Sequence, residues 1–202
     1  MRSLRWMTFA LLAIAAGLTT AHAAGADNVR LVRIDNGPNT LKIRGQEALV
    51  FRAWRENFNA HGFGVITFYL RSKTDGTPAR WALIPFLSHG KDGDKDHLEL
   101  TTSGGADCQL HDFRLLMTPD GREVSVIVAD RDMGESYVDT QTVHFDYYTL
   151  AENAEGIPGW PPFYFKAVKT VDAKAKYCDV NEAFDKELHL GTSSGVTGNG
   201  VD

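Results

Sequence analysis

Apolar and polar residues alternate in short runs along most of this chain, which is the pattern of half-buried β-strands. The runs are rich in β-branched and aromatic residues. Clusters of glycine, aspartate, asparagine and proline separate them, and Pro119-Asp120-Gly121 is typical of a tight turn between two strands. The pattern predicts strands over residues 29–34, 40–43, 48–55, 65–70, 81–87, 98–102, 113–117, 124–129, 143–150 and 163–171.

One segment near the C-terminus has the pattern of a helix instead. Asp179 followed by Glu182 matches a capping box, Phe184 and Leu188 supply an apolar stripe, and Gly191 is expected to end the helix. No long amphipathic segment lies between the predicted strands to connect them as parallel pairs. The sequence therefore predicts a mainly β protein, an antiparallel sheet or sandwich-like single domain with one short C-terminal helix.

The first 23 residues have the pattern of a Sec-type signal peptide. Arg2 and Arg5 precede an apolar run over residues 6–18, and Ala21-His22-Ala23 is a small-residue cleavage site. The apolar run is shorter than the roughly 20 residues of a membrane-spanning helix. We therefore expect cleavage after Ala23, a periplasmic location and no membrane span after processing. The mainly β domain is expected over 24–190, followed by a flexible Gly- and Ser-rich tail over 191–202.

Charge and cysteine content narrow the class of protein further. The predicted mature chain retains 19 basic residues against 26 acidic ones, and the basic residues are scattered, so nucleic acid is not an expected partner. Cys108 and Cys178 are the two cysteines. An even pair in an exported protein predicts a disulfide, with two buried thiols as the alternative. An exposed sheet edge would allow a homodimer.

A dense polar segment between two predicted strands is the first candidate for binding. It contains Arg55, Glu56, Asn57, Asn59 and His61 within seven residues. One interpretation is a surface that recognises a small anionic or polar ligand, or a partner chain. The other is a long turn whose side chains satisfy its own backbone groups.

A second candidate surrounds Cys108, where His111 and Asp112 follow a Gly-Gly pair. Adjacent residues on a strand point to opposite faces, so a turn that supports the disulfide is the alternative to an acid–base pair. The histidines lack the spacing of zinc ligands, and the alternating aspartates of residues 92–96 lack the glutamate of a calcium loop. We predict no catalytic nucleophile, no metal site and no cofactor.

Three segments together resemble a known family. Residues 55–61, residues 100–108 with 111–114, and residues 177–184 are similar to the carbapenem self-resistance (CarG-like) family of exported bacterial proteins. The resemblance extends over roughly residues 28–190. It implies a periplasmic protein that protects cells from a carbapenem without hydrolysing the β-lactam, and it assigns no role to individual residues.

Three hypotheses of function follow. The first is a non-enzymatic protective protein of this family that binds the drug, a β-lactam small molecule, or shields its cell-wall target. The second is a general module that binds an envelope protein or glycan through residues 55–61. The third is a hydrolase, which would require Ser103, His111 and Asp112 to surround one pocket.

Overall fold

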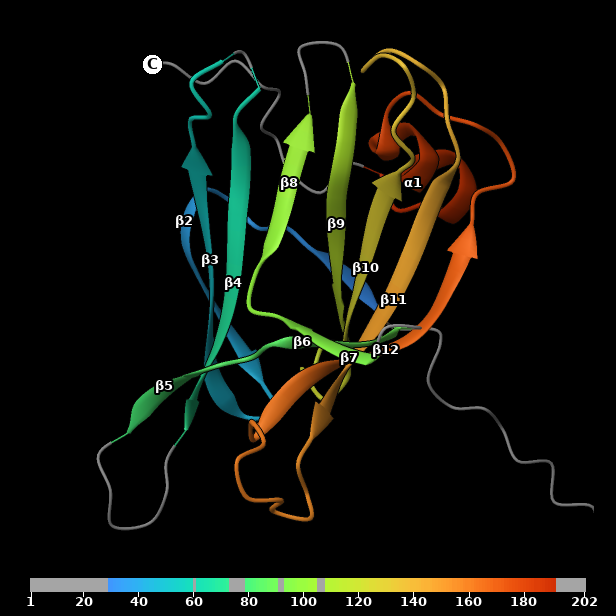
Figure 1. The fold of residues 1–202 in the computed structure, drawn as a ribbon. Helices are drawn as coiled ribbons and strands as arrows, with labels where there is room; N and C mark the ends of the chain where they lie inside the picture. The colour runs from blue at the N-terminus through green and yellow to red at the C-terminus, as the bar shows by residue number, and fades with distance from the viewer. Residues whose placement is uncertain (1–28, 60, 73–78, 91–92, 105–107, 192–202) are drawn as a thin grey trace, which may run out of the picture.

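The computed structural model describes residues 29–59, 61–72, 79–90, 93–104 and 108–191, and Figure 1 shows its strands and its short helix. In this part of the chain the elements are β1 (Arg30–Val32), β2 (Gly37–Ile43), β3 (Gln46–Arg55), β4 (Phe63–Ser72), β5 (Arg80–Leu83), β6 (Phe86–Gly90), β7 (Gly93–His97), β8 (Leu100–Gly104), β9 (Gln109–Met117), β10 (Val124–Arg131), β11 (Val143–Glu152), β12 (Phe163–Asp172) and α1 (Val180–Leu188). The predicted mainly β class is confirmed. The predicted signal peptide and nearly all of the predicted tail lie outside the described residues.

The strands form one continuous hydrogen-bonded path in the order β2-β3-β4-β8-β9-β10-β11-β12-β6-β7, with β1 paired to β9 and β5 paired to β4. Of the described strand pairs, β12 with β6 is parallel and the others are antiparallel. In Figure 1, β6 and β7 run across the lower part of the other strands. Phe86 of β6 stacks on Phe165 of β12 with ring centroids 4.6 Å apart, inside the larger apolar core.

The turn between β9 and β10 falls at the predicted Pro119–Gly121 segment. Gly121 has a φ of +67°, and a Cβ at this position would collide with the backbone carbonyl of Lys42. The backbone N–H of Arg44 donates to the Gly121 carbonyl at 2.9 Å. Glycine is therefore required by both the turn and its packing against the β2–β3 hairpin.

The C-terminal helix forms where it was predicted, but its ends differ in detail. The Asp179 side chain caps it by accepting from the backbone N–H of Asn181 at 2.7 Å. Glu182 does not complete a capping box, because its carboxylate accepts from Lys186 Nζ one turn later at 2.6 Å. The helix ends at Leu188 and is capped by His189 in the left-handed conformation, so the expected stop at Gly191 was wrong by two residues.

Helix α1 covers a second, smaller core. Val180, Ala183 and Phe184 pack against apolar side chains of β10 and β11, including Ile127 and Phe145. A disulfide joins Cys108, just before β9, to Cys178, just before α1, with Cα atoms 5.7 Å apart. The predicted bridge is therefore present and ties the start of the helix to the sheet. The part of the chain that the structure describes contains no helix long and apolar enough to cross a membrane.

Candidate ligand-binding pocket

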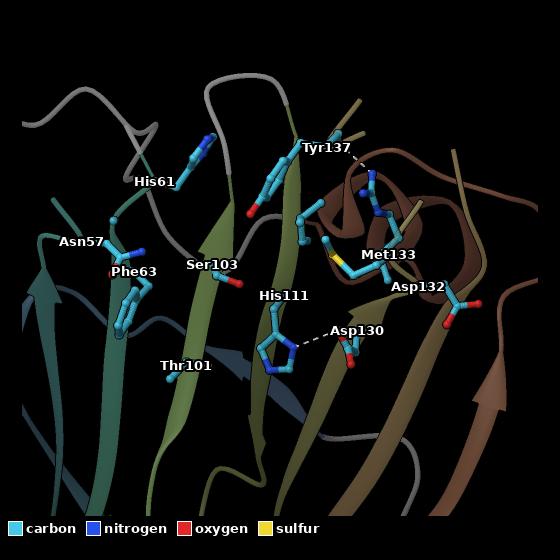
Figure 2. Close-up of a pocket in the computed structure, with 13 residues that line it drawn as sticks. Asn57, His61, Phe63, Thr101, Ser103, His111, Asp130, Asp132, Met133 and Tyr137 are labelled. Atoms are coloured by element: carbon cyan, nitrogen blue, oxygen red, sulfur yellow. Dashed lines mark hydrogen bonds and ion pairs between the residues drawn. The ribbon is translucent and has the colours of Figure 1, made fainter. Parts of the chain in front are cut away.

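A pocket of about 410 Å³ opens where β4 and β9 begin and β8 and β10 end, which is one common end of these antiparallel strands (Figure 2). This size is in the range of pockets that bind small molecules. Its walls combine hydrogen-bonding groups with aromatic and thioether side chains. The lining residues are Asn57, His61, Gly62, Phe63, Thr101, Ser103, Leu110, His111, Asp130, Arg131, Asp132, Met133 and Tyr137.

The register of the strands places five side chains in one transverse row. Arg55 pairs with Phe63, Phe63 with Ser103, Ser103 with His111, and His111 with Asp130. Directly opposed residues of antiparallel strands have neighbouring Cβ atoms, so the row forms a continuous strip across β3, β4, β8, β9 and β10. Figure 2 shows four of its members along the wall of the pocket.

His111 is held by the acidic residue next to it in the row. Its Nδ1 lies 3.2 Å from Asp130 Oδ1, within the distance of an ion pair (Figure 2). Because Nδ1 faces this carboxylate, Nε2 is the ring nitrogen left for a ligand. In the described part of the chain no hydrogen bond joins Ser103 to His111, although both residues line the pocket.

The row continues past the pocket into a second histidine–carboxylate group. Asp130 pairs with His144, and His144 with Asp172. His144 Nδ1 lies 2.7 Å from Asp172 Oδ1, and its Nε2 lies 3.1 Å from Asp132 Oδ1. The hydrogen bond with Asp172, helped by Asp132, raises the pKa of His144 above its usual value. Binding of a proton by His144 therefore stabilises the folded state, in which the imidazole contacts both carboxylates.

The upper wall of the pocket is an aromatic stack. The rings of His61 and Tyr137 lie parallel, with centroids 4.6 Å apart and planes at 6° (Figure 2). The backbone N–H of His61 donates to Asn59 Oδ1 at 2.8 Å, which shapes the turn before β4. His61 Nδ1 is buried and has no hydrogen-bond partner among the described residues.

Arg55 stands at the edge of the pocket and contacts two of its lining residues. Its guanidinium lies over the Phe63 ring, 4.8 Å from the centroid. Its Nη1 donates to Asn57 Oδ1 at 3.1 Å. These contacts hold an exposed positive charge above the β4 end of the pocket.

Arg131 fixes the loop that supplies Tyr137. The Arg131 side chain is buried, and its Nη1 donates to the backbone carbonyls of Tyr137 at 2.9 Å, Asp139 at 2.6 Å and Cys178 at 3.1 Å. One guanidinium therefore joins the end of β10, the loop after it and the disulfide. Because Arg131 holds the backbone of this loop, it fixes the position of the Tyr137 ring against His61.

The comparison with protein families identifies the relationship. A family model described as "Carbapenem resistance protein CarG-like" matches residues 34–186, which include every residue that lines the pocket. The chain belongs to the CarG-like family. Its fold is similar to the crystal structure of CarG, with a TM-score of 0.61 and 22% sequence identity over 81% of this chain and 99% of that one. A search of curated protein sequences found no match.

In this CarG-like protein the structure brings together only part of the predicted binding set. Asn57, His61 and His111 line the pocket, and Arg55 contacts its wall. The remaining predicted residues lie outside it. Glu56 accepts from Trp54 Nε1 at 3.0 Å, Asn59 accepts from the His61 backbone, and Asp112 is buried on the other side of β9.

Asp112 has a structural environment. Its Oδ2 lies 3.0 Å from Nη1 of Arg114, whose side chain is fully buried. The same guanidinium donates to Asn181 Oδ1 at 2.8 Å and, through Nε, to the Gly191 carbonyl at 2.8 Å. The pair therefore joins β9 to both ends of the helical segment. The arrangement of Ser103, His111 and Asp112 around one pocket, which the hydrolase hypothesis required, is not present.

Sequence reasoning missed Asp130, Asp132, Met133 and Tyr137. Asp130 is the second-to-last residue of β10, where only the apolar positions gave a signal, and the other three lie in the loop after this strand. The alternation of β10 could have revealed Asp130. It has the same parity as Val126 and Val128, which face the core, so the pattern predicts a charged side chain at the edge of that core.

Proposed function

We propose that this CarG-like protein protects a bacterial cell from a carbapenem in the periplasm, without hydrolysing the drug, by binding it in the pocket between Asn57 and Tyr137. The observation that carries the proposal is a pocket of drug-sized volume, within the family-matched region, that presents hydroxyl, amide and imidazole groups beside aromatic rings. Such a lining suits a small ligand with several polar groups on a compact apolar body.

Two features support the location and the lack of hydrolysis. The Cys108–Cys178 disulfide fits an oxidising compartment. A serine hydrolase needs its nucleophile hydrogen-bonded to a base, and in the described residues Ser103 has no such bond to His111. Asp130, rather than a hydroxyl, is the group that His111 Nδ1 faces.

The test compares a carbapenem-sensitive host that exports the protein with the same host making residues 24–202 without the signal. We expect drug tolerance to rise only with export. Purified protein mixed with a carbapenem should leave the β-lactam absorbance unchanged over hours while the drug binds in calorimetry. Rapid ring opening, or equal tolerance in both strains, would contradict the proposal.

A second candidate function is docking to an envelope protein, and the segment before β4 favours it. Phe58 is 99% exposed and has a positive φ of 57°, an uncommon backbone conformation for a bulky residue. Trp54, four positions earlier in the chain, is also exposed. Exposed aromatic side chains of this kind act as anchors at protein interfaces.

Cross-linking in cells, followed by purification, tests this alternative with Phe58→Ala against the exposed control Val168→Ala. Val168 lies on β12 and is likewise exposed. Loss of one specific cross-linked partner from the Phe58 variant alone would support docking. Identical sets of cross-linked partners for wild type and both variants would contradict docking through Phe58.

A further inference from the structure

The transverse row across the pocket has opposite charges at its two ends. Arg55 is at the β3 end, and Asp130 is at the β10 end with Asp132 just beyond it. The Asp130 and Asp132 side chains are 59% and 54% exposed, so both remain open to a ligand although each faces a histidine. Between the charged ends lie Phe63, Ser103 and His111, and Nδ1 of His111 faces Asp130.

The positive end lies closer to the pocket than the position of Arg55 on β3 suggests. Because the Arg55 guanidinium lies over the Phe63 ring, its charge sits above β4 rather than β3. The hydrogen bond to Asn57 holds it there. At the other end, the Asp130 carboxylate lies against the His111 ring. The two charges therefore lie toward opposite ends of the row, one at the rim of the pocket and the other in its wall.

The spacing of strands gives the separation of these charges. From β4 to β10 there are three steps of about 4.8 Å, or roughly 14 Å in a flat sheet. A charge-assisted hydrogen bond occupies about 3 Å at each end. A ligand that contacts both ends therefore has opposite charges about 8 Å apart.

We infer that the pocket binds a dipolar small molecule, with its carboxylate at the Arg55 end and its ammonium group at the Asp130–Asp132 end. This inference rests on the proposed ligand-binding function of the same pocket. Between the charges, the hydroxyls of Thr101 and Ser103 and Nε2 of His111 are placed to bond polar groups of the ligand. Phe63 supplies an apolar contact at the Arg55 end of the pocket.

Two sources of ligand share this chemistry: a carbapenem that carries a side-chain ammonium group, and a short peptide with unblocked termini. Calorimetry on the exported, purified protein distinguishes them. One arm compares an ammonium-bearing carbapenem with a carbapenem whose side chain is neutral. The other compares trialanine with its N-acetyl and C-terminal amide forms. In at least one arm we expect the dipolar compound to bind roughly 2- to 5-fold more tightly than its blocked counterpart, as for a partly exposed ion pair.

Charge-neutralising variants locate each end. Asp130→Asn preserves the shape beside His111 and should weaken binding of the dipolar compound about 2- to 5-fold, with little change for the compound that lacks an ammonium group. Arg55→Gln should weaken both members of a carboxylate-bearing pair. Arg122→Gln is the control, because Arg122 lies in the turn at the opposite end of the β9–β10 hairpin and should change neither.

The outcomes separate this inference from the proposed function. Equal binding of dipolar and blocked compounds, with no effect of Asp130→Asn, would overturn the charge assignment and leave drug binding intact. Binding of none of the compounds would overturn the inference and also remove this pocket from the proposed function. Selective binding of trialanine alone would support the dipolar site but would place its ligand among cell-wall or other peptides rather than the drug.

Discussion

Tyr137 lies flat on His61, 4.6 Å between ring centroids, although 76 positions of sequence separate them. One ring comes from the turn before β4 and the other from the loop after β10. The stack therefore closes the pocket between two parts of the sheet that no direct strand pairing connects at this point.

Removing this ring is expected to open the pocket. Tyr137→Ala should cost about 1 kcal/mol of unfolding free energy, the typical contribution of an aromatic pair, and should weaken ligand binding about tenfold. Urea unfolding and calorimetry measure the two effects. Tyr137→Phe retains the ring and is the matched control, so equal loss in both variants would show that the stack is not the cause.

Arg114 is expected to be the most sensitive charged position in the protein. Its fully buried guanidinium contacts Asp112, Asn181 and the Gly191 carbonyl and lies 4.0 Å from the centroid of the Phe184 ring. Arg114→Met leaves the Asp112 carboxylate buried without this cation, which costs about 3–5 kcal/mol.

Denaturant unfolding measures this cost. The control is Arg33→Met, because Arg33 is an exposed residue that pairs with Asp35 on the surface. An exposed pair of this kind contributes at most about 1 kcal/mol. Similar midpoints for the two variants would contradict the assignment of Arg114 as the anchor of α1.

The disulfide should account for a large share of the stability. It closes a loop of 70 residues between Cys108 and Cys178. The chain-entropy model gives about 4 kcal/mol for such a loop. We expect the double variant Cys108→Ser, Cys178→Ser to unfold at much lower urea, and wild type treated with reductant to match it. A wild-type midpoint that reductant does not move would contradict this prediction.

His144 makes stability depend on pH. Its raised pKa, caused first by Asp172 and then by Asp132, means that the folded state holds the proton to higher pH than the unfolded state does. The stabilisation is therefore fully present below the unfolded pKa of about 6.5 and is lost as pH rises through the folded pKa. His144→Gln should remove this part of the pH dependence. Urea unfolding of both proteins between about pH 5 and 9 would show their difference shrinking as pH rises.

The positions of several strands and of the helix could be predicted from the chain because they depend on local signals. Alternation located β3, β4, β10 and β11, and the Pro119–Gly121 turn joined β9 to β10 as expected. The start of β9 was missed because Gln109, His111 and Asp112 interrupt its apolar pattern. These polar residues belong to the strand because tertiary contacts, the disulfide at Cys108 and the buried Arg114, hold it.

The pocket was harder to predict because it depends on register between distant strands. Polar density drew attention to Asn57, His61 and His111, which the structure places in the lining of the pocket. It also drew in Glu56 and Asp112, because a list of residue types does not show which side of a strand each one occupies. Asp130 became visible only when β10 was aligned beside β9, since its partner His111 is 19 positions away in the chain.

The transverse row has a consequence for the ligand itself. Its two ends, Arg55 on β3 and Asp130 on β10, are far apart in the sequence, so no short fragment of the chain contains both ends of the site. A molecule seated along the row fastens these strands together as a reversible cross-link, alongside the permanent one made by the cysteines. At a concentration one hundred times its dissociation constant, such a ligand adds about 2.7 kcal/mol to the free energy of unfolding. The protein would then be most resistant to unfolding and proteolysis in the cells that contain its ligand, and its abundance would follow the ligand without any change in gene expression.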